Sequence, residues 1–363
     1  MSVTPTNILL IRLRLIGDVV FTTPLIGALK RMFPAARLSY LVEQEAAPVL
    51  AGHPLVDALI VTARIRGWPR LLADARLALR LRRSRFDLVL DLHGGPRSAW
   101  LTLATGARAR IGYDIQGRRG VYTHMVHRPR GLHARHSVRN QWDLLTAIDG
   151  WPTAAADPTR DPVYMAPSAE ASARVAARLR AAGVRDTDTL IVVHVSAGNP
   201  FRRWPEGAFV SLVAALARHA PDRRLVLSSG PSDRPAAARI AAQAGQQLGA
   251  AAHRIVDCGE LDLAELRAVI ARSRLFVGGD TGPLHVAATT STPVVGIYGP
   301  TLAERSAPWR DSRIPTASLH VDGLSCRPCD QRVCEPGDFR CLTTLQPDRV
   351  ITAAERLLAG SAP

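Results

Sequence analysis

Short apolar runs alternate along the chain with longer stretches in which Ala, Leu and Arg recur at helical spacing. Runs of about four to eight residues rich in Val, Ile and Leu are typical of buried strands, whereas an apolar residue every three or four positions is typical of an amphipathic helix. Their alternation predicts βαβ units, and therefore parallel sheets with helices on both faces.

The predicted elements fall into two similar series. In the first half, the pattern predicts strands at Ile8–Leu13, Leu38–Val42, Ala58–Val61, Leu88–Leu92 and Arg110–Gly112, with helices between them that include Pro24–Met32 and Pro69–Arg82. In the second half, it predicts strands at Leu190–Val195, Arg224–Ser228, Arg254–Asp257, Leu275–Gly278 and Pro293–Tyr298, and helices near Pro205–Ala217, Arg234–Leu248 and Leu263–Arg272. A final amphipathic helix is predicted at about Asp348–Leu358.

The join between the two series lies in residues 150–168, which are rich in Pro, Ala and Asp. A chain of 363 residues is long enough for two domains. The sequence therefore predicts an α/β protein with two Rossmann-like domains, at residues 1–160 and 161–346, followed by a C-terminal helix at residues 347–363.

Composition narrows the choice of partners. Hydrophobic residues make up 47% of the chain and charged residues 21%, which is a globular composition, and aromatics make up only 5%. Few aromatics argue against a base-stacking surface for single-stranded nucleic acid. The net charge is +15 and comes almost wholly from Arg. Because Arg binds phosphates and carboxylates, we expect nucleic acid, an anionic membrane face or an anionic small substrate as partner.

No part of the sequence has the length of uninterrupted apolar residues, about 18, that a membrane-spanning helix needs. The N-terminal sequence NILLIRLRLIGDVVF is interrupted by Arg12 and Arg14, and no small-residue cleavage site follows it. We interpret it as a first buried strand and expect a cytoplasmic protein.

Polar residues follow the predicted strands, where ligands of open α/β sheets bind. In RLIGDVVFTTP, Gly17 permits a sharp turn and Asp18 begins a helix, either as its N-cap or as a catalytic carboxylate. In DLHGGPRSAW, His93 and Arg97 stand at a Gly-rich turn that either approaches a ligand or is an ordinary loop with a hydrogen-bonded His.

The second series repeats this arrangement. Ser196 and Arg202 follow one strand, and a backbone turn with an Arg can hold phosphate, although a solvated loop anchored by Trp204 has the same sequence. Asp233 follows the next strand, either as an N-cap or as a hydrogen-bond partner for a base or ribose.

The sequence GGDTGPLH, at residues 278–285, is the most elaborate of these turns. We expect Asp280 to cap the next helix, while Thr281 and Gly282 offer free N–H groups and His285 lies on the first turn. Pro283 suits the start of a helix, where its missing N–H costs nothing. Such a turn predicts a site for a nucleotide diphosphate and a hydroxyl-rich sugar.

The pieces RLIGDVVFTTP, DLHGGPRSA, RRWP and GGDTGPLHVA…PVVGIYGPT resemble, in this order over nearly the whole chain, the bacterial heptosyltransferases of glycosyltransferase family 9. The resemblance implies a GT-B fold, in which two Rossmann-like domains with parallel sheets face each other across a cleft that holds the active site. It also implies an inverting, metal-independent transfer. The C-terminal domain would bind a nucleotide-sugar, typically ADP-L-glycero-D-manno-heptose, and the N-terminal domain the inner core of lipopolysaccharide.

The resemblance assigns roles to single residues. Asp18 matches the general base that takes the proton from the acceptor hydroxyl. Arg202 stands where the family commonly has a Lys that holds the diphosphate, and Leu261 replaces a residue that packs by the adenine. The donor-binding residues implied are Ser196, Arg202, Asp233, Leu261, Asp280, Thr281, Gly282 and His285, and those implied for the acceptor are His93 and Arg97.

The same resemblance implies the partners. These are ADP-heptose as donor, lipid A–Kdo or a core oligosaccharide as acceptor, and the inner face of the inner membrane as a peripheral binding surface. We therefore expect that catalysis requires no cofactor and that the protein binds no nucleic acid.

Two metal-type motifs remain. Asp186 and Asp188 form an Asp-x-Asp motif, but it precedes a predicted strand, so we interpret it as a loop at the wrong end of the sheet. The sequence CRPCDQRVCEPGDFRC has the spacing of a metal site and favours a structural role, with zinc, reduced thiols or a disulfide pair as the alternatives. Its four cysteines are Cys326, Cys329, Cys334 and Cys341.

Two other functions remain to be compared with glycosyl transfer. A nicotinamide-dependent oxidoreductase predicts Gly-x-Gly-x-x-Gly after the first strand, and RLIGDVV lacks it. A nucleic-acid-binding module requires Arg gathered on one face, whereas here Arg is spread over most helices. The Arg-rich run at residues 76–85 is then a solvated helix face, or a surface for anionic lipid or for the phosphates and carboxylates of an acceptor.

Overall fold

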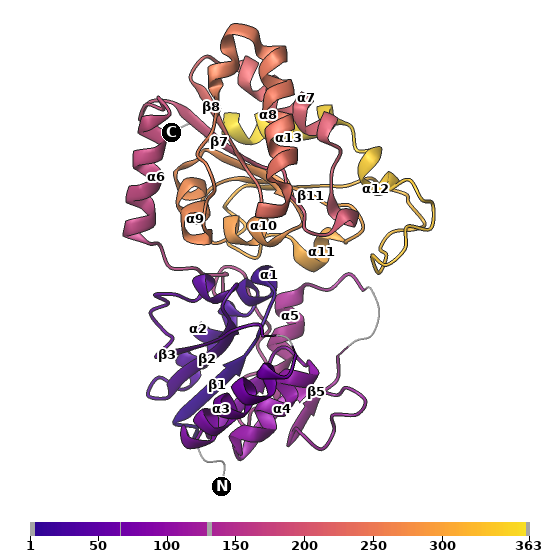
Figure 1. Ribbon diagram of the computed structural model, residues 1–363. Helices are drawn as coiled ribbons and strands as arrows, with labels where there is room; N and C mark the ends of the chain where they lie inside the picture. The colour runs from indigo at the N-terminus through magenta and orange to yellow at the C-terminus, as the bar shows by residue number, and fades with distance from the viewer. Residues whose placement is uncertain (1–3, 66, 129–132, 361–363) are drawn as a thin grey trace. The chain divides into compact units, whose positions relative to one another are not determined.

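The computed structural model describes residues 4–65, 67–128 and 133–360, and it divides into two compact units between Ala166 and Pro167 (Figure 1). Each unit contains a six-stranded sheet, with strand order β3-β2-β1-β4-β5-β6 in the first and β12-β11-β10-β7-β8-β9 in the second. Every strand pair is parallel. The predicted α/β fold with two Rossmann-like domains is therefore confirmed.

The first unit has the following elements. Its strands are β1 (Asn7–Ile11), β2 (Arg37–Glu43), β3 (Ala58–Thr62), β4 (Leu88–Asp91), β5 (Ala109–Tyr113) and β6 (His124–Val126). Its helices are α1 (Ile16–Val20), α2 (Thr23–Met32), α3 (Pro69–Arg83), α4 (Pro96–Thr105) and α5 (Ser137–Trp142), with short 3-10 turns η1 (Ala47–Val49) and η2 (Asp143–Ala147).

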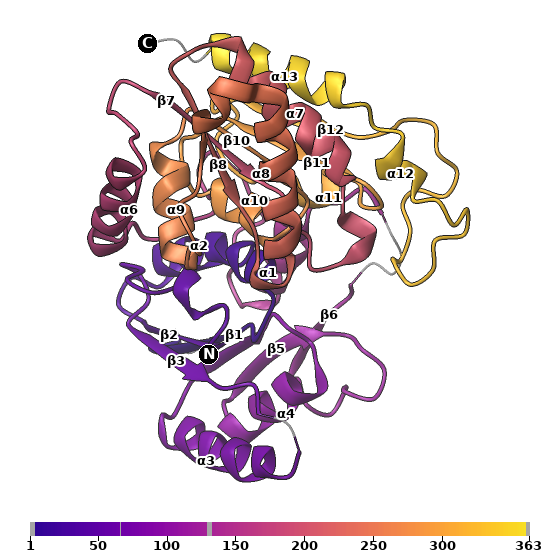
Figure 2. The ribbon, with the colours of Figure 1, turned by 45° about the horizontal axis from the view of Figure 1, so that its top comes forward.

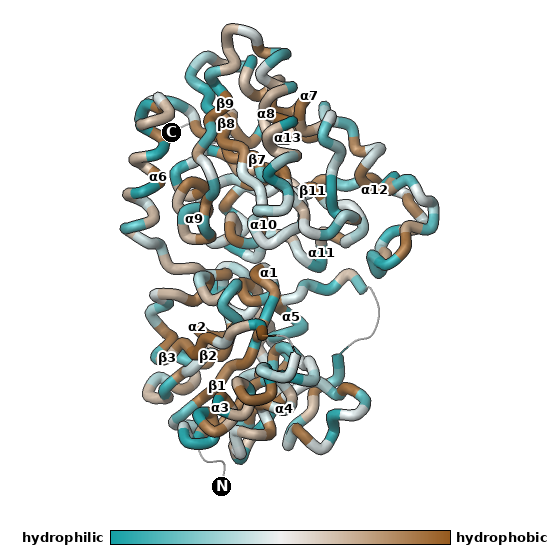
Figure 3. The backbone as a smooth tube through the Cα atoms, in the orientation of Figure 1, coloured by the Kyte–Doolittle hydropathy of each residue, from teal (hydrophilic) through white to brown (hydrophobic). Residues whose placement is uncertain are grey.

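The core of this unit explains its continuous apolar strands. Leu9 and Ile11 of β1 pack in one cluster with Leu81 of α3 and Leu101 of α4, while the residues between them point to the other face of the sheet and are equally buried. Strands covered on both faces contain almost no polar residues, which is why they show as brown segments in Figure 3.

The second unit is larger. Its strands are β7 (Thr189–His194), β8 (Arg223–Ser228), β9 (Ile255–Val256), β10 (Leu275–Gly279), β11 (Val294–Ile297) and β12 (Thr316–Leu319). Its helices are α6 (Ala169–Ala181), α7 (Glu206–His219), α8 (Arg234–Leu248), α9 (Leu263–Arg272), α10 (Gly282–Ala287), α11 (Ala303–Ser306), α12 (Arg340–Thr343) and α13 (Pro347–Gly360). Its 3-10 turns are η3 (Pro200–Arg202), η4 (Pro231–Asp233) and η5 (Gly249–Arg254).

Alternate residues of β7 build two separate cores. Ile191 and Val193 pack with residues of α7, α8 and α13, whereas Leu190 and Val192 pack with residues of α6, α9 and α10. Helix α13 packs in the first of these two cores and extends slightly beyond the predicted Asp348–Leu358.

The predicted strands and helices are all present, with ends that differ by a few residues. The largest difference is the strand predicted at Arg254–Asp257, which shrinks to Ile255–Val256 because Arg254 belongs to η5. The edge strands β6 and β12 were not predicted. Edge strands keep exposed and polar positions, such as His124 and Thr316, so they lack a continuous apolar run. In the described part of the chain, no helix is long and apolar enough to cross a membrane.

Candidate active site

The polar strand ends of the second unit lie at one edge of its sheet. Strands β10, β7 and β8 are neighbours and parallel, so the turns that follow them emerge at the same, carboxyl edge. These turns contain most of the residues predicted to bind a donor.

Ser196 and Asp233, which follow different strands, are brought into contact. The Ser196 hydroxyl donates a short hydrogen bond to the Asp233 carboxylate, and the Arg203 Nη2 lies 3.1 Å from the other oxygen of that carboxylate. Asp233 occupies the N-cap position of α8, but its side chain makes no capping hydrogen bond. The Asp233 carboxylate therefore faces the turn after β7. Arg203 also belongs to this site, a role that the sequence analysis did not assign to it.

Asp280 is a second buried carboxylate at this edge, with 2% of its surface exposed. Arg202 Nη1 donates to the Asp280 carbonyl oxygen at 2.8 Å and lies 3.2 Å from Oδ2, while His285 Nε2 lies 3.6 Å from Oδ1. Neither carboxylate oxygen accepts a hydrogen bond from the described residues. Arg202, Asp280 and His285 are thus brought together as the sequence predicts.

The expectation that Asp280 caps the following helix is wrong. The N-cap of α10 is Thr281, which has an extended backbone and makes no side-chain capping bond, and Gly282 is the first helical residue. The backbone enters the helix one residue later than the sequence suggested. The Asp280 side chain makes no capping hydrogen bond to the helix N–H groups and lies beside Arg202 instead.

Gln331 is a member of this site that sequence reasoning missed. Its Oε1 accepts hydrogen bonds from Arg202 Nε at 2.8 Å and from Asn199 Nδ2 at 2.9 Å. The residue lies within the four-cysteine segment, residues 326–341, for which the sequence predicts a structural role. An uncharged Gln in an irregular segment carries no sequence signal of its own, so only the fold reveals it.

The four-cysteine segment packs on two strand-end turns. Arg327 Nε donates to the Gly299 carbonyl at 2.6 Å, and the Phe339 ring meets that of Phe201 edge-on at 5.3 Å. All its cysteines are free thiols, and burial raises the pKa of Cys341 to about 11. Within residues 4–65, 67–128 and 133–360, no group of His, Cys, Asp or Glu side chains is arranged to hold a metal ion. The structural zinc stays a prediction.

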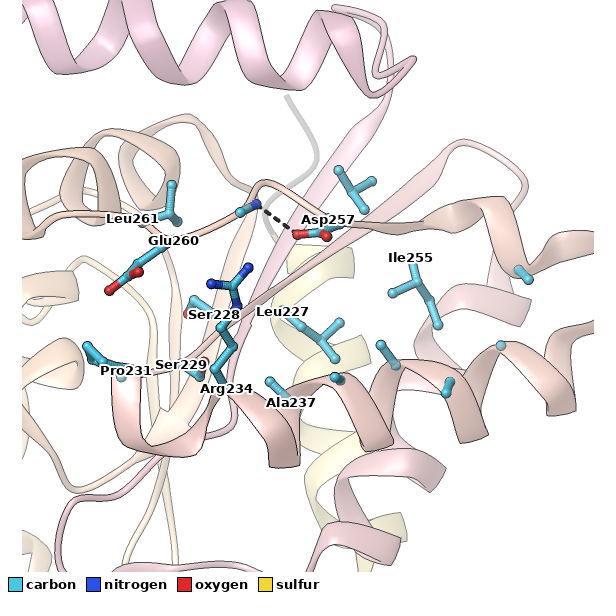
Figure 4. A pocket seen from close by; sticks show the side chains of 18 residues that line it. Leu227, Ser228, Ser229, Pro231, Arg234, Ala237, Ile255, Asp257, Glu260 and Leu261 are labelled. Atoms are coloured by element: carbon cyan, nitrogen blue, oxygen red, sulfur yellow. Dashed lines mark hydrogen bonds between the residues drawn. The ribbon is translucent and has the colours of Figure 1, made fainter.

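A cavity of about 620 Å³ opens beside the turn that follows β8 (Figure 4). Small and apolar side chains such as Ala237 and Ile255 line part of it, and Arg234, Asp257 and Glu260 supply polar groups. Leu261, predicted to lie by a base, is one of the lining residues. A pocket that combines an apolar wall with a few charged groups suits a nucleoside.

His194 ends β7 next to this cavity. Its Nδ1 is 3.0 Å from the hydroxyl of Ser228, which lines the cavity. Burial lowers the His194 pKa to about 4, so the imidazole is neutral at physiological pH. It therefore acts as a hydrogen-bonding group that fixes the Ser228 hydroxyl.

In the first unit, Asp18 is held by an arginine. The N-cap of α1 is Leu15 and Asp18 is the third helical residue, so Asp18 is not the cap. The Arg12 guanidinium forms a short ion pair with the Asp18 carboxylate and donates to the Leu92 carbonyl at 2.7 Å. Asp18 keeps 35% of its side chain exposed, whereas Arg12 is buried. Arg12, which interrupts the first apolar run, thereby fixes Asp18 at the carboxyl edge of the first sheet.

His93 follows β4, the neighbour of β1, and belongs to the same edge. Burial, together with the positive charges of Arg12 and Arg14, lowers the His93 pKa to about 4. The turn itself is organised by Asp91, whose carboxylate accepts hydrogen bonds from the Gly94 N–H at 2.9 Å and from the His93 N–H at 3.0 Å.

Arg97 has internal partners. Its guanidinium pairs with Asp74 at 2.7 Å and with Glu43 at 2.8 Å, and only 12% of its side chain is exposed. These contacts tie α4 to α3 and β2. A role for Arg97 in acceptor binding stays a prediction.

The Asp-x-Asp motif lies in the turn before β7, at the opposite edge of the second sheet, as its sequence position predicts. Asp186 pairs with Arg272 at 2.5 Å, and Asp188 with Arg185 at 2.8 Å. Both carboxylates are thus engaged by arginines in a surface loop.

Comparison with known proteins agrees with this arrangement. The chain is 28% identical over 357 residues to lipopolysaccharide heptosyltransferase 3 of Escherichia coli, which covers 96% of this chain and 98% of the relative. It is 27% identical over 376 residues to lipopolysaccharide heptosyltransferase 1 of Pseudomonas aeruginosa, which covers 97% and 98%. The similarity thus extends through both units.

Solved structures share the fold. A glycosyl transferase family 9 protein from Veillonella parvula superposes with a TM-score of 0.80 at 21% identity, covering 98% of each chain. The ADP-heptose LPS heptosyltransferase II of Escherichia coli gives a TM-score of 0.77 at 20% identity, covering 98% of this chain and 99% of the other. The family model "Glycosyltransferase family 9 (heptosyltransferase)" matches residues 75–337. The chain therefore belongs to glycosyltransferase family 9, the heptosyltransferase family.

Proposed function

We propose that this heptosyltransferase moves a heptose from ADP-heptose to the inner core of lipopolysaccharide, with inversion at the anomeric carbon and without a metal ion. One observation supports this most strongly. The Asp280 carboxylate is buried at the strand edge, and neither of its oxygens accepts a hydrogen bond from the described residues. Arg202 and His285 lie beside this carboxylate as charged or polar neighbours, but a buried oxygen that accepts no hydrogen bond is costly, and the hydroxyls of a donor sugar would supply the missing donors.

The nucleotide is assigned to the cavity beside β8. Its apolar wall, which includes Leu261, would pack on the base, and the Ser196–Asp233 pair would meet the ribose. Two solved relatives from Escherichia coli, heptosyltransferase WaaC with ADP and with ADP-2-deoxy-2-fluoro heptose, share the fold at TM-scores of 0.69 and 0.67. What those proteins bind supports ADP-heptose as the donor here.

The diphosphate is assigned to Arg202, with the backbone N–H groups of Thr281 and Gly282 beside it. A guanidinium can bind two phosphate oxygens at once, where a lysine in this place would offer a single point charge. The Gln331 carbonyl oxygen holds Arg202 through its Nε, and the Asp280 carbonyl oxygen holds its Nη1, so Nη2 would face the leaving group. His285 would hold the Asp280 carboxylate in place.

The transfer is a single displacement. The Asp18 carboxylate accepts the proton of an acceptor hydroxyl, and that oxygen forms a bond to the anomeric carbon from the face opposite the ADP. The bond from the anomeric carbon to the diphosphate oxygen breaks, and its electron pair leaves with ADP. Arg202 stabilises the negative charge that develops there. The acids of the Asp-x-Asp motif are paired with arginines at the other edge of the sheet, which supports a mechanism without a metal ion.

The acceptor is proposed to be lipid A–Kdo or a core oligosaccharide, with His93 and Arg97 in the unit that binds it. The relatives that carry lipopolysaccharide in their names support this class of acceptor. Because such an acceptor is anchored in lipid, we also propose that the protein binds peripherally at the inner face of the inner membrane. A nicotinamide oxidoreductase and a nucleic-acid-binding protein are not favoured by any of these observations.

Thermal unfolding in the presence of ADP, UDP, GDP and NAD tests the proposal. We expect ADP to raise the melting temperature most. ADP would bind only the folded protein, in which the cavity and Arg202 are in place, and would therefore stabilise the folded state. Asp280→Asn should lower the affinity for ADP-heptose more than the affinity for ADP, since the carboxylate is assigned to the sugar. Stabilisation by NAD alone would refute the glycosyltransferase assignment.

A further inference from the structure

Helix α3 (Pro69–Arg83) presents an apolar stripe on its outer face. Trp68, immediately before the helix, is 72% exposed, and Leu72 and Leu79 are 50% and 58% exposed. Positions 68, 72 and 79 fall on one side of a helix, because a helix repeats every 3.6 residues. Leu81 and Asp74, on the opposite side, are buried against the first unit. The stripe is therefore additional to the face that the helix needs for folding.

The charges around the stripe are all of one sign. Arg76, Arg80 and Arg83 line a shallow hollow together with Leu79. In the part of the chain that the structure describes, none of these three arginines has an acidic partner. The only acid of the helix, Asp74, is buried and already paired with Arg97 and Arg70. The outer face of α3 thus combines exposed apolar side chains with uncompensated positive charge.

We propose that α3 is the element that docks this protein on an anionic lipid surface. This inference rests on the proposed peripheral membrane association and assigns it to one helix. A helix that carries Trp and Leu on one side and arginines beside them lies in the plane of a membrane interface, with the arginines at the level of the lipid phosphates. Arginine stems can lie along the apolar surface while the guanidinium reaches the headgroups.

The position of α3 suits this role. In Figures 1 and 2, α3 lies along the outside of the first unit, beside α4. Its inner side packs on the strands, and its outer side is exposed. A second copy of the chain is a poorer occupant of this face, because two α3 helices that pack on each other would bring their arginines together. Phosphodiester headgroups instead supply the opposite charge along the whole helix.

Vesicle flotation tests the inference with the full chain. We expect binding to vesicles of equal parts phosphatidylglycerol and phosphatidylcholine, and none to phosphatidylcholine alone. Replacing the three arginines (R76Q/R80Q/R83Q) should weaken binding on the order of a hundredfold at low salt. Each arginine near an anionic surface raises the affinity for the membrane about fivefold. The apolar variant L72S/L79S should also weaken binding. The control R313Q/V333S removes an exposed arginine and an exposed valine from the second unit and should bind unchanged.

Quenching by brominated lipid gives a second measurement. We expect anionic vesicles with brominated acyl chains to quench part of the tryptophan fluorescence, and we expect W68F to lose that part. Urea unfolding shows whether each variant is folded. We expect the free energy of unfolding to stay nearly unchanged, because all of the replaced side chains are exposed.

Each outcome separates the two claims. If the unaltered protein binds no anionic vesicle, both the docking helix and the peripheral association are wrong, whereas ADP binding still tests the transferase. If it binds and the α3 variants bind equally well, only the assignment to α3 is wrong. If the unaltered protein sediments as a dimer that L72S/L79S converts to a monomer, the face is an interface between copies and the lipid inference fails.

Discussion

At the residue scale, each unit has a strand-end carboxylate that is held by an arginine. Asp18 is held by Arg12, and Asp280 by Arg202. The sequence identified both carboxylates because each follows a strand. It did not identify the pairing of Asp18, because Arg12 lies inside the strand-like run and its partner is on the next element. Which arginine meets which carboxylate depends on side-chain directions that only the folded sheet sets.

Asp18→Asn removes the proposed base with almost no change in shape. We expect the rate of heptose transfer to fall on the order of 10²- to 10⁴-fold, because general base catalysis contributes about that much. ADP should bind as before, since the residues proposed to bind the donor lie in the second unit and Asp18 lies in the first. Initial rates and calorimetry with ADP measure the two effects. Asp186→Asn, in an exposed loop, is the control, and wild-type rates in D18N would remove Asp18 from the mechanism.

Gln331→Leu tests the residue that only the structure revealed. Loss of its Oε1 leaves Arg202 Nε without its partner, so the donor KM should rise roughly five- to tenfold, as expected for one hydrogen bond of about 1 kcal/mol. Gln331→Glu keeps an acceptor oxygen and should restore most of the affinity. Gln346→Leu, at an exposed position, serves as control. Equal KM values for Q331L and the unaltered protein would show that Arg202 needs no such support.

At the element scale, helices on both faces hold each sheet and place its carboxyl-edge turns. The helices α13 and α7 cover one face of the second sheet, and α9 and α6 the other. The amphipathic pattern of α13 was readable from the sequence. That α13 packs on α7 was not, because a helical pattern shows that a face is buried without showing which surface buries it.

Val350→Asp tests the role of α13 in stability. Val350 is fully buried in the core beneath α7, so an aspartate there would bury an unpaired carboxylate. We expect the free energy of unfolding to fall by about 3 kcal/mol or more. Urea denaturation measures it, with the exposed Thr352→Asp as a matched control on the same helix. Equal stability of the two variants would contradict the packing described for α13.

The strand end at His194 predicts a pH dependence. The pKa of His194 is lowered to about 4 in the folded protein, so the unfolded chain, with a pKa near 6.5, binds the proton more readily. The free energy of unfolding is therefore unaffected by His194 above about pH 6.5. It decreases as the pH falls from 6.5 towards 4, because the unfolded chain takes up a proton on His194 before the folded protein does. Urea denaturation at several pH values should show a shallower decline for His194→Gln. Parallel curves would show that His194 does not contribute.

At the scale of the whole molecule, two units each carry their own parallel sheet and core, and the residues proposed to act in transfer divide between them. The proposed base is in the first unit and the residues proposed to bind the donor are in the second. This division follows from the tandem repetition of βαβ units, which the sequence shows directly.

Metal removal tests the proposed mechanism of the whole enzyme. We expect transfer to proceed at an unchanged rate in EDTA, because Arg202 is the proposed partner of the departing diphosphate and the Asp-x-Asp acids are paired elsewhere. The assay follows ADP release with and without added Mg²⁺. A rate that falls in EDTA and recovers with Mg²⁺ would show that a metal ion assists the leaving group.

The sequence by itself determined the α/β class, the parallel strands and the strand-end positions of Asp18, Arg202, Asp233 and Asp280. These follow from local rules, since buried strands need apolar runs and sharp turns need glycine and polar residues. Only the tertiary structure decided that Ser196 contacts Asp233, that Gln331 supports Arg202, and that Arg97 forms ion pairs with Asp74 and Glu43. Such contacts join residues far apart in the chain, and their geometry is set by how strands pair and helices pack.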